Sequence, residues 1–284
     1  MRYLAYCTLI ALLNISCSSL QSKPAEITES RDTGKTQLQL ANQEIDRGRF
    51  SVAGQYLERA WLYAVQNDDP ELRIKVRLTR GNVAFYQSRK NEARQDWNAA
   101  LAEAEHEAKS ELVAIVKVYV AWGTLLEAME DGNADVALIQ GLQKVFERER
   151  ENITSDRLSL ALTWTGSGLA AKELRQWERA EAALKKALEI HEGGNYLIQA
   201  AYDWFLIASV RSQAGQYPQA VEALKQALAL DRRAENSNGL SFDWTALGEV
   251  YDKMGDYPNA QKARQRAKEI TKAAAAQKDL SLLQ

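Results

Sequence analysis

Two stretches near the C-terminal end of the chain carry one pattern: WFLIASVRSQAGQYPQA at residues 204–220 and WTALGEVYDKMGDYPNA at residues 244–260. The tryptophan, the glycine before the tyrosine, the tyrosine, the proline and the last alanine all recur after forty residues. Forty residues closer to the N-terminus stand Trp164, Trp177 and Ala180. Equal steps between matching side chains indicate an internal repeat, in which each copy is one structural unit that stacks on the next.

The same frame continues toward the N-terminus, so that six copies lie between residues 35 and 270. Each copy has an alanine at one fixed place: Ala53, Ala93, Ala137, Ala180, Ala220 and Ala260. Seven residues later stand Ala60, Ala100, Lys144, Ala187, Ala227 and Ala267. Copy three departs most from the pattern, because Leu125, Ala134 and Lys144 replace a small, an aromatic and a small residue.

The pattern resembles that of the tetratricopeptide-repeat family, and the last copy keeps nearly all of it: Trp244, Leu247, Gly248, Tyr251, Gly255, Tyr257, Ala260 and Ala267. The resemblance implies an all-α fold, a superhelical solenoid of about six helix-turn-helix units with a C-terminal capping helix. The expected units are about 35–70, 71–110, 111–150, 151–192, 193–233 and 234–270, and residues 271–284 form the end of the last helix and the tail.

The residue types suit such pairs of helices. Small residues at Gly168, Gly248 and the repeated alanines let two helices approach closely. Glycine before the aromatic residue permits a tight turn, and Pro218 and Pro258 stand at the start of the second helix, where a missing N–H costs nothing. Trp164, Trp204 and Trp244 are expected to pack between helix layers.

The first seventeen residues read as a targeting segment. Arg2 precedes an apolar run over residues 4–13, which is shorter than the about 20 residues a membrane-spanning helix needs. The following Ser16 and Cys17 resemble the lipobox of bacterial lipoproteins, although Asn14 stands where that family prefers leucine. The resemblance implies a signal peptide over residues 1–17, lipidation of Cys17 and, because Ser18 follows, sorting to the outer membrane; an ordinary cleaved signal is the alternative. Residues 18–34 are polar and predict a flexible tether, and no later segment suggests a membrane helix.

Composition argues against several classes of function. The formal net charge is -2, from 36 basic and 38 acidic residues, and gives no electrostatic case for binding nucleic acid. Both cysteines lie in the first seventeen residues, and His106 and His191 are expected to be solvated, so no metal site is predicted. No catalytic or phosphate-binding motif is present. We therefore expect no catalytic residues, no cofactor and no enzyme activity.

A binding surface remains. In the resembled family the first helix of each unit lines a concave face suited to an extended or helical peptide. Carried over by the frame, the expected partner-binding residues are Asn42, Asp46, Lys75, Asn82, Tyr86, Tyr202, Phe205, Ser209, Gln213, Phe242, Glu249 and Lys253.

These features predict a lipid-anchored scaffold of the bacterial cell envelope, on the periplasmic face of the outer membrane, that binds protein or peptide partners. One alternative is a partner protein of a periplasmic solute-transport system. A second is a ligand-binding or enzymatic solenoid, which a buried cluster of titratable groups or a deep apolar pocket on the concave side would favour.

Overall fold

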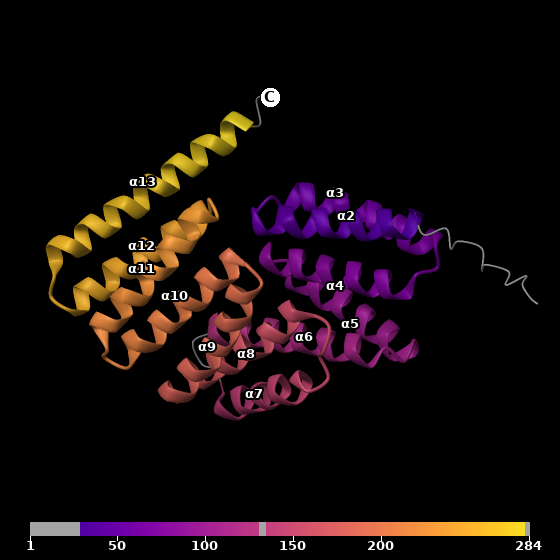
Figure 1. Ribbon diagram of the computed structural model, residues 1–284, viewed down its shortest axis with the longest axis horizontal. Helices are drawn as coiled ribbons and strands as arrows, with labels where there is room; N and C mark the ends of the chain where they lie inside the picture. Colours follow the sequence, from indigo (N-terminus) through magenta and orange to yellow (C-terminus); the bar gives the residue numbers. More distant parts are fainter. Residues whose placement is uncertain (1–28, 131–134, 282–284) are drawn as a thin grey trace, which may run out of the picture.

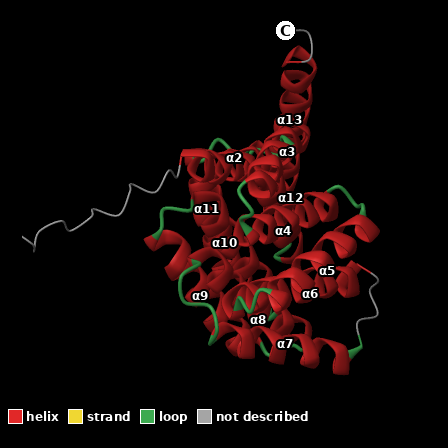
Figure 2. Cartoon of the chain, turned by 90° about the vertical axis from the view of Figure 1, so that its right-hand side faces the viewer, coloured by secondary structure: helices red, strands yellow, loops and turns green. Residues whose placement is uncertain are grey.

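The computed structural model describes residues 29–130 and 135–281, with side chains as far as residue 276. These residues form twelve helices and no strand (Figure 2). The helices are α2 (Glu29–Asp46), α3 (Phe50–Gln66), α4 (Pro70–Tyr86), α5 (Lys90–His106), α6 (Ser110–Glu130), α7 (Val136–Arg150), α8 (Arg157–Glu173), α9 (Trp177–Gly193), α10 (Leu197–Gln213), α11 (Tyr217–Arg233), α12 (Ser237–Lys253) and α13 (Tyr257–Ser281).

Consecutive helices form antiparallel pairs, from α2–α3 to α12–α13, and the pairs stack side by side along a curved array (Figure 1). Each pair also packs on the next one along the chain. The predicted all-α solenoid with a long C-terminal helix is confirmed. The expected signal peptide over residues 1–17, with Cys17, lies outside the described residues, as does the tether as far as residue 28.

The forty-residue step has a simple structural origin. Helices α8 to α12 are each 17 residues long, and three-residue turns separate them. Two such helices and two such turns make one step. Residues such as 231–233 and 237–239, which separate the copies in the sequence frame, lengthen α11 and α12 by about a turn each rather than forming loops.

Turns within and between the pairs share one geometry. Gly215 and Gly255 have φ of +79° and +77°, the left-handed conformation that glycine adopts without strain. The next amide bonds back across the helix end, as in Gln216 N to the Arg211 carbonyl at 2.8 Å, which satisfies a carbonyl that the helix leaves unpaired. Arg175 adopts φ of +57° at the corresponding place, at a cost of about 1–2 kcal/mol.

Small residues bring the helices together. Five of the repeated alanines, Ala53, Ala93, Ala180, Ala220 and Ala260, are fully buried. A Cβ atom on Gly168 would lie 2.7 Å from Leu184 Cγ and 3.1 Å from the Ala180 carbonyl, so only glycine fits between α8 and α9 there. Most of the buried apolar side chains form one continuous core from α4 to α13, and a second, smaller core lies among α2, α3 and α4.

In the third unit the buried positions differ from those predicted by the repeat frame. Ala137 and Lys144 were expected at packing positions of the second helix, but both are exposed. Ile139 and Phe146, two residues further on, are buried at 1% and 0% exposure. The frame already steps 44 residues from Ala93 to Ala137, which accounts for the four extra residues of α6. The further shift of two arises because five residues, where most turns have three, separate Glu130 at the end of α6 from Val136 at the start of α7.

The start of the solenoid is also earlier than expected. The tether was predicted to extend to residue 34, but α2 begins at Glu29. Gly34 is buried, and a Cβ atom there would lie 2.7 Å from Leu72 Cδ2, so this part of the helix packs closely on α4. Glu29 and Asp32 in the first turn favour a helix start here, because their negative charges interact favourably with the positive end of the helix dipole.

One helix in the described ranges, Ser110–Glu130 (α6), is long and apolar enough to cross a membrane by length and composition. No such segment was expected from the sequence. Of the most apolar 18-residue stretch of this helix, 56% is buried inside the solenoid. Its apolar character is therefore that of a core helix packed on α4, α5, α7 and α8.

Candidate partner-binding surface on the inner wall

The first helix of each pair faces the inside of the curve. First helices of successive pairs contact one another directly, from α2–α4 through α4–α6, α6–α8 and α8–α10 to α10–α12. A stack of pairs bends toward the side on which its elements approach most closely. The inner wall therefore consists of α2, α4, α6, α8, α10 and α12 (Figure 1).

Aromatic side chains are the most exposed apolar groups of this wall. Tyr86 on α4 is 55% exposed, Tyr202 on α10 is 41% exposed and Phe242 on α12 is 67% exposed. Phe205 is half-buried and stacks on Tyr202 with ring centroids 6.3 Å apart. Because water ordinarily disfavours such exposure, an aromatic surface of this kind is typical of a recognition site.

The polar residues expected on the wall divide into two groups. Most are open to solvent or half-buried: Asn42, Asp46, Lys75, Ser209, Gln213, Glu249 and Lys253. Three have partners on another element: Asp46 accepts from Gln199 on α10, Lys253 Nζ donates to Ser212 Oγ at 3.1 Å, and Asn82 Oδ1 accepts from Trp97 Nε1 at 3.0 Å. Asn82 thus holds α4 to α5, and its carbonyl oxygen is not free for a partner.

The curve brings the two ends of the wall together. Gln199 Nε2 on α10 donates to Asp46 Oδ1 on α2 at 3.3 Å, although the residues are 153 positions apart in sequence. Tyr86 stacks on Phe50, with ring centroids 6.3 Å apart and an interplanar angle of 17°. Asp46, Tyr86, Tyr202 and Phe205, predicted separately, therefore belong to one region of the wall.

Protein surrounds these rings even where water reaches them. Desolvation by the surrounding chain raises the pKa of Tyr86, Tyr119 and Tyr202, and the charge of Asp46 raises the pKa of Tyr86 further. Sequence reasoning missed Phe50, Tyr119 and Gln199. The frame places Phe50 at a turn and gives no weight to the other two, because their role depends on how far the array curves.

Beside this region, the start of the wall carries mixed charge. A cavity of 460 Å³ lies between α2, α4 and the turn before α6, and its cations include Lys35, Lys75 and Lys109. A second cavity of 330 Å³ shares Lys75 and Lys109 and continues toward α8. The hydrogen bond from Lys75 to Glu71, 2.7 Å long, lowers the pKa of that carboxyl.

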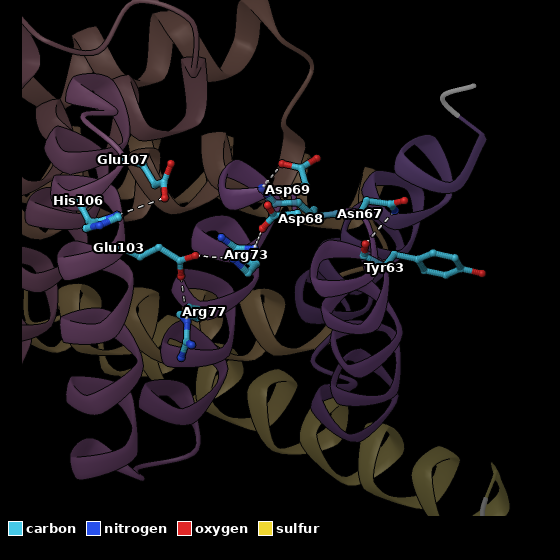
Figure 3. Close-up of polar contacts among 10 residues, drawn as sticks. Tyr63, Asn67, Asp68, Asp69, Arg73, Arg77, Glu103, His106 and Glu107 are labelled. Atoms are coloured by element: carbon cyan, nitrogen blue, oxygen red, sulfur yellow. Dashed lines mark hydrogen bonds and ion pairs between the residues drawn. The ribbon is translucent and has the colours of Figure 1, made fainter. Parts of the chain in front are cut away.

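Charges at the joint between the first two pairs neutralise one another instead. Figure 3 shows Arg73 between Asp68 and Glu103, at 2.8 and 2.5 Å, with Arg77 on the other oxygen of Glu103 at 3.4 Å. These contacts hold α4 against α5 and against the turn that precedes α4. The joint is therefore structural rather than a surface with unsatisfied charge.

The two histidines differ from each other. His106 is exposed, as expected, with 84% of its side-chain area accessible. The expectation that His191 is solvated is wrong, because its side chain is only 7% exposed and its Nδ1 lies 2.6 Å from Asp203 Oδ2. Asp203 is fully buried and also accepts a hydrogen bond from Thr165 at 3.2 Å. Across residues 29–130 and 135–281, no three His, Cys, Asp or Glu side chains are grouped to hold a metal.

The tryptophans pack as the frame predicts, but closer to the surface. Trp164, Trp204 and Trp244 are half-buried, and cations lie over two of the rings: Arg150 is 3.4 Å from the Trp164 centroid and Arg266 is 5.0 Å from that of Trp244. Such contacts stabilise an aromatic ring at the protein surface. Trp204 and Trp244 pack against the main core, and Trp164 is covered by Arg150.

Comparison with known proteins agrees with this architecture. Residues 196–273, which include α10 to α12 and much of α13, match the tetratricopeptide-repeat family. The chain is similar to BtubC from P. vanneervenii, with 16% identity, a TM-score of 0.52 and coverage of 87% of this chain and 90% of that one. It is also similar to PilW, a type IV pilus biogenesis factor, with 16% identity, a TM-score of 0.51 and coverage of 81% and 90%.

A Rap protein complexed with Competence and Sporulation Factor shares 16% identity with the chain, with a TM-score of 0.55 and coverage of 86% and 76%. No curated protein sequence matches the chain. At these identities the structural likeness establishes the fold alone, that of stacked antiparallel helix pairs.

Proposed function

The chain is a tetratricopeptide-repeat protein, and we propose that it is a non-catalytic scaffold holding a protein or peptide partner against the inner wall of its superhelix. The observation that carries this proposal is the exposure of Tyr86, Tyr202 and Phe242 on three first helices of one concave wall. Aromatic rings supply contact area with little side-chain entropy to lose, which suits them to recognition. The Rap protein complexed with Competence and Sporulation Factor has the same fold and adds support.

An enzymatic role has less support. The chain does contain buried titratable groups, such as His191 with Asp203, and Asp231 near Asp243. All four side chains are at least nine-tenths buried, between one pair of helices and the next. A substrate has no access to groups in such a position, so they suit packing between units better than catalysis.

We further propose that lipidation of Cys17 anchors the scaffold in the bacterial cell envelope, on the periplasmic face of the outer membrane. The support is the lipobox-like Ser16-Cys17-Ser18 after a short apolar run. More than one acyl chain gives stable anchoring where a single chain gives only reversible binding. A partner within a solute-transport system and one within an envelope assembly are both compatible with this location.

Photo-cross-linking tests the scaffold proposal. We expect p-benzoylphenylalanine at Tyr202 or Phe242 to cross-link one specific partner in envelope extracts. The matched control is the same probe at Leu62, which is 66% exposed on α3, a second helix. Partners captured from Leu62 but not from the two inner-wall positions would contradict the proposal.

A Cys17→Ser variant tests the anchor. Without the thiol no acyl chain can be attached, so the protein should move from the detergent-rich to the aqueous phase in a phase-partition assay. Its circular dichroism spectrum and melting curve should match those of the wild type. A variant that still partitions with detergent would refute lipidation at this residue.

A further inference from the structure

Asp46 is an acid on the inner wall without a cationic partner of its own. It lies at the end of α2, and its one hydrogen-bond partner in the described part of the chain is the neutral amide of Gln199. Arg47, the nearest cation in sequence, instead pairs with Glu44 at 3.0 Å and acts on Asp46 only through its longer-range charge. The side chain of Asp46 is nevertheless open to solvent.

Tyrosines from three inner-wall helices lie in the region of this acid. Tyr86 on α4 and Tyr119 on α6 are within electrostatic reach of Asp46, and Tyr202 on α10 is within reach of Tyr86. Phe50 supports Tyr86 by stacking, and Phe205 supports Tyr202 in the same way, with an interplanar angle of 11°. One stacked pair comes from α3 and α4 and the other from α10, and the hydrogen bond between Gln199 and Asp46 links α10 to α2 beside them.

A second close approach joins the first pair of helices to the C-terminal part of the inner wall. A Cβ atom on Gly48, in the turn after α2, would lie 3.5 Å from the side-chain amide of Asn238 on α12. The first pair therefore meets α10 and α12 across the curve, so a partner in this region would meet side chains from both halves of the array.

We propose that Asp46, Tyr86 and Tyr202 form a subsite for one cationic side chain, arginine or lysine, of a peptide segment bound inside the superhelix. A carboxylate without a counter-ion attracts a cation, and the faces of tyrosine rings attract it as well. Arginine suits the subsite best, because its planar guanidinium can stack on a ring and donate two hydrogen bonds to one carboxylate. Gln199 holds the carboxylate through one long hydrogen bond, which an incoming cation can replace.

This inference rests on the proposed function, and one experiment separates the two. A random dodecapeptide phage library is selected on the full-length protein in detergent. Enriched peptides are then synthesised and their affinities measured by fluorescence anisotropy. We expect the enriched peptides to share a basic residue at a fixed register, and exchange of an arginine for neutral citrulline to weaken binding by roughly tenfold.

An Asp46→Asn variant should lose most of that factor for the arginine peptide and should discriminate much less between the arginine and citrulline peptides than the wild type does. Tyr202→Leu should also weaken the arginine peptide more than the citrulline peptide. The matched control is Glu105→Gln, which removes an exposed carboxylate on α5 and should leave both affinities unchanged. Melting curves establish that each variant is folded.

Peptides that bind without a basic residue, or that bind Asp46→Asn as tightly as the wild type, would overturn the subsite and leave the scaffold proposal intact. The scaffold proposal predicts that enriched peptides bind more weakly to a Tyr202→Ala, Phe242→Ala double variant. If no enriched peptide does so, the result counts against the scaffold proposal and against the subsite.

Discussion

Two successive joints of the solenoid occupy the same place in the repeat but carry different chemistry. At the joint between α9 and α10, His191 Nδ1 and Asp203 Oδ2 are 2.6 Å apart. Forty residues further on, at the joint between α11 and α12, the corresponding residues are Asp231 and Asp243. Two acids thus stand where the previous joint has an acid and a base.

The residues around the two joints differ in a way that matches this exchange of a base for an acid. At the first joint the ring edge of Tyr196 packs on His191, and both oxygens of Asp203 have partners. At the second joint Asn236 replaces the tyrosine and donates to Asp231 at 2.9 Å. Gly239 leaves the space for that carboxylate, since a Cβ atom there would lie 1.9 Å from Asp231 Oδ2.

The pKa values of the buried acids differ between the two joints. Asp243 is 2% exposed, and its Oδ2 has no hydrogen-bond partner in the described part of the chain. Burial, reinforced by the charge of Asp231, raises the pKa of Asp243 to about 8, while burial raises the pKa of Asp231 to about 6. At the first joint, burial also raises the pKa of Asp203, but His191 opposes the shift. One backbone geometry therefore tolerates both an acid bonded to an imidazole and a pair of acids of which one holds its proton at neutral pH.

The largest effect expected is from Asp203→Ala, which removes both hydrogen bonds of a fully buried acid and leaves His191 unpaired. Loss of one partner of a buried pair costs about 3–5 kcal/mol, so we expect about 3 kcal/mol less stability in urea denaturation. The matched change Asp243→Ala should cost less than about 1 kcal/mol, because one oxygen has no partner to lose. Equal losses at the two joints would remove the distinction between them.

Next in size is the pH dependence of the second joint. Because Asp243 holds its proton more tightly in the folded than in the unfolded state, its contribution to stability is full below the ordinary pKa of about 4. That contribution is lost as the pH rises toward about 8. Relative to Asp243→Asn, the wild type should lose up to about 1.4 kcal/mol of unfolding free energy for each pH unit between these limits. Parallel stability curves for the two proteins would show that Asp243 ionises normally.

The smallest effect comes from transplanting the first joint onto the second. Asp231→His should create an ion pair with Asp243 and raise stability at neutral pH by about 1 kcal/mol. It should also flatten the pH dependence described above. Asp231→Asn is the control, because it removes a charge without supplying a base, and it should give less than half of the gain. A destabilised Asp231→His would mean that Gly239 and Asn236 do not leave room for the imidazole.

Much of the fold could be predicted from the sequence, because the pattern repeats locally. Alanines such as Ala180, Ala220 and Ala260 mark where helices touch, and this contact involves neighbours within one copy. The prediction was wrong in the third unit, where a longer connection between α6 and α7 shifts the buried positions to Ile139 and Phe146. The length of a connection leaves no trace in a pattern that is read from side-chain type alone.

The site was less predictable for a different physical reason. The repeat frame could place Tyr86 and Tyr202 on first helices, but their approach depends on small angles between pairs that accumulate along the array. The Asp46–Gln199 contact forms because those angles add up along the array, and no local sequence pattern indicates it. His191 was misjudged for a related reason: its segment is polar in sequence, and only the packing of α10 on α9 buries it.

The division of the apolar interior into two cores has a mechanical consequence. The smaller core, which includes Ala41, Leu57 and Leu72, unites α2 and α3 with one face of α4, whereas the larger core unites α4 with everything that follows. Tension on the chain from its N-terminal side is borne first by the smaller core. We therefore expect the first pair to separate under load before the later pairs do, because beyond the smaller core it is held to the stack by contacts such as that between Asp46 and Gln199.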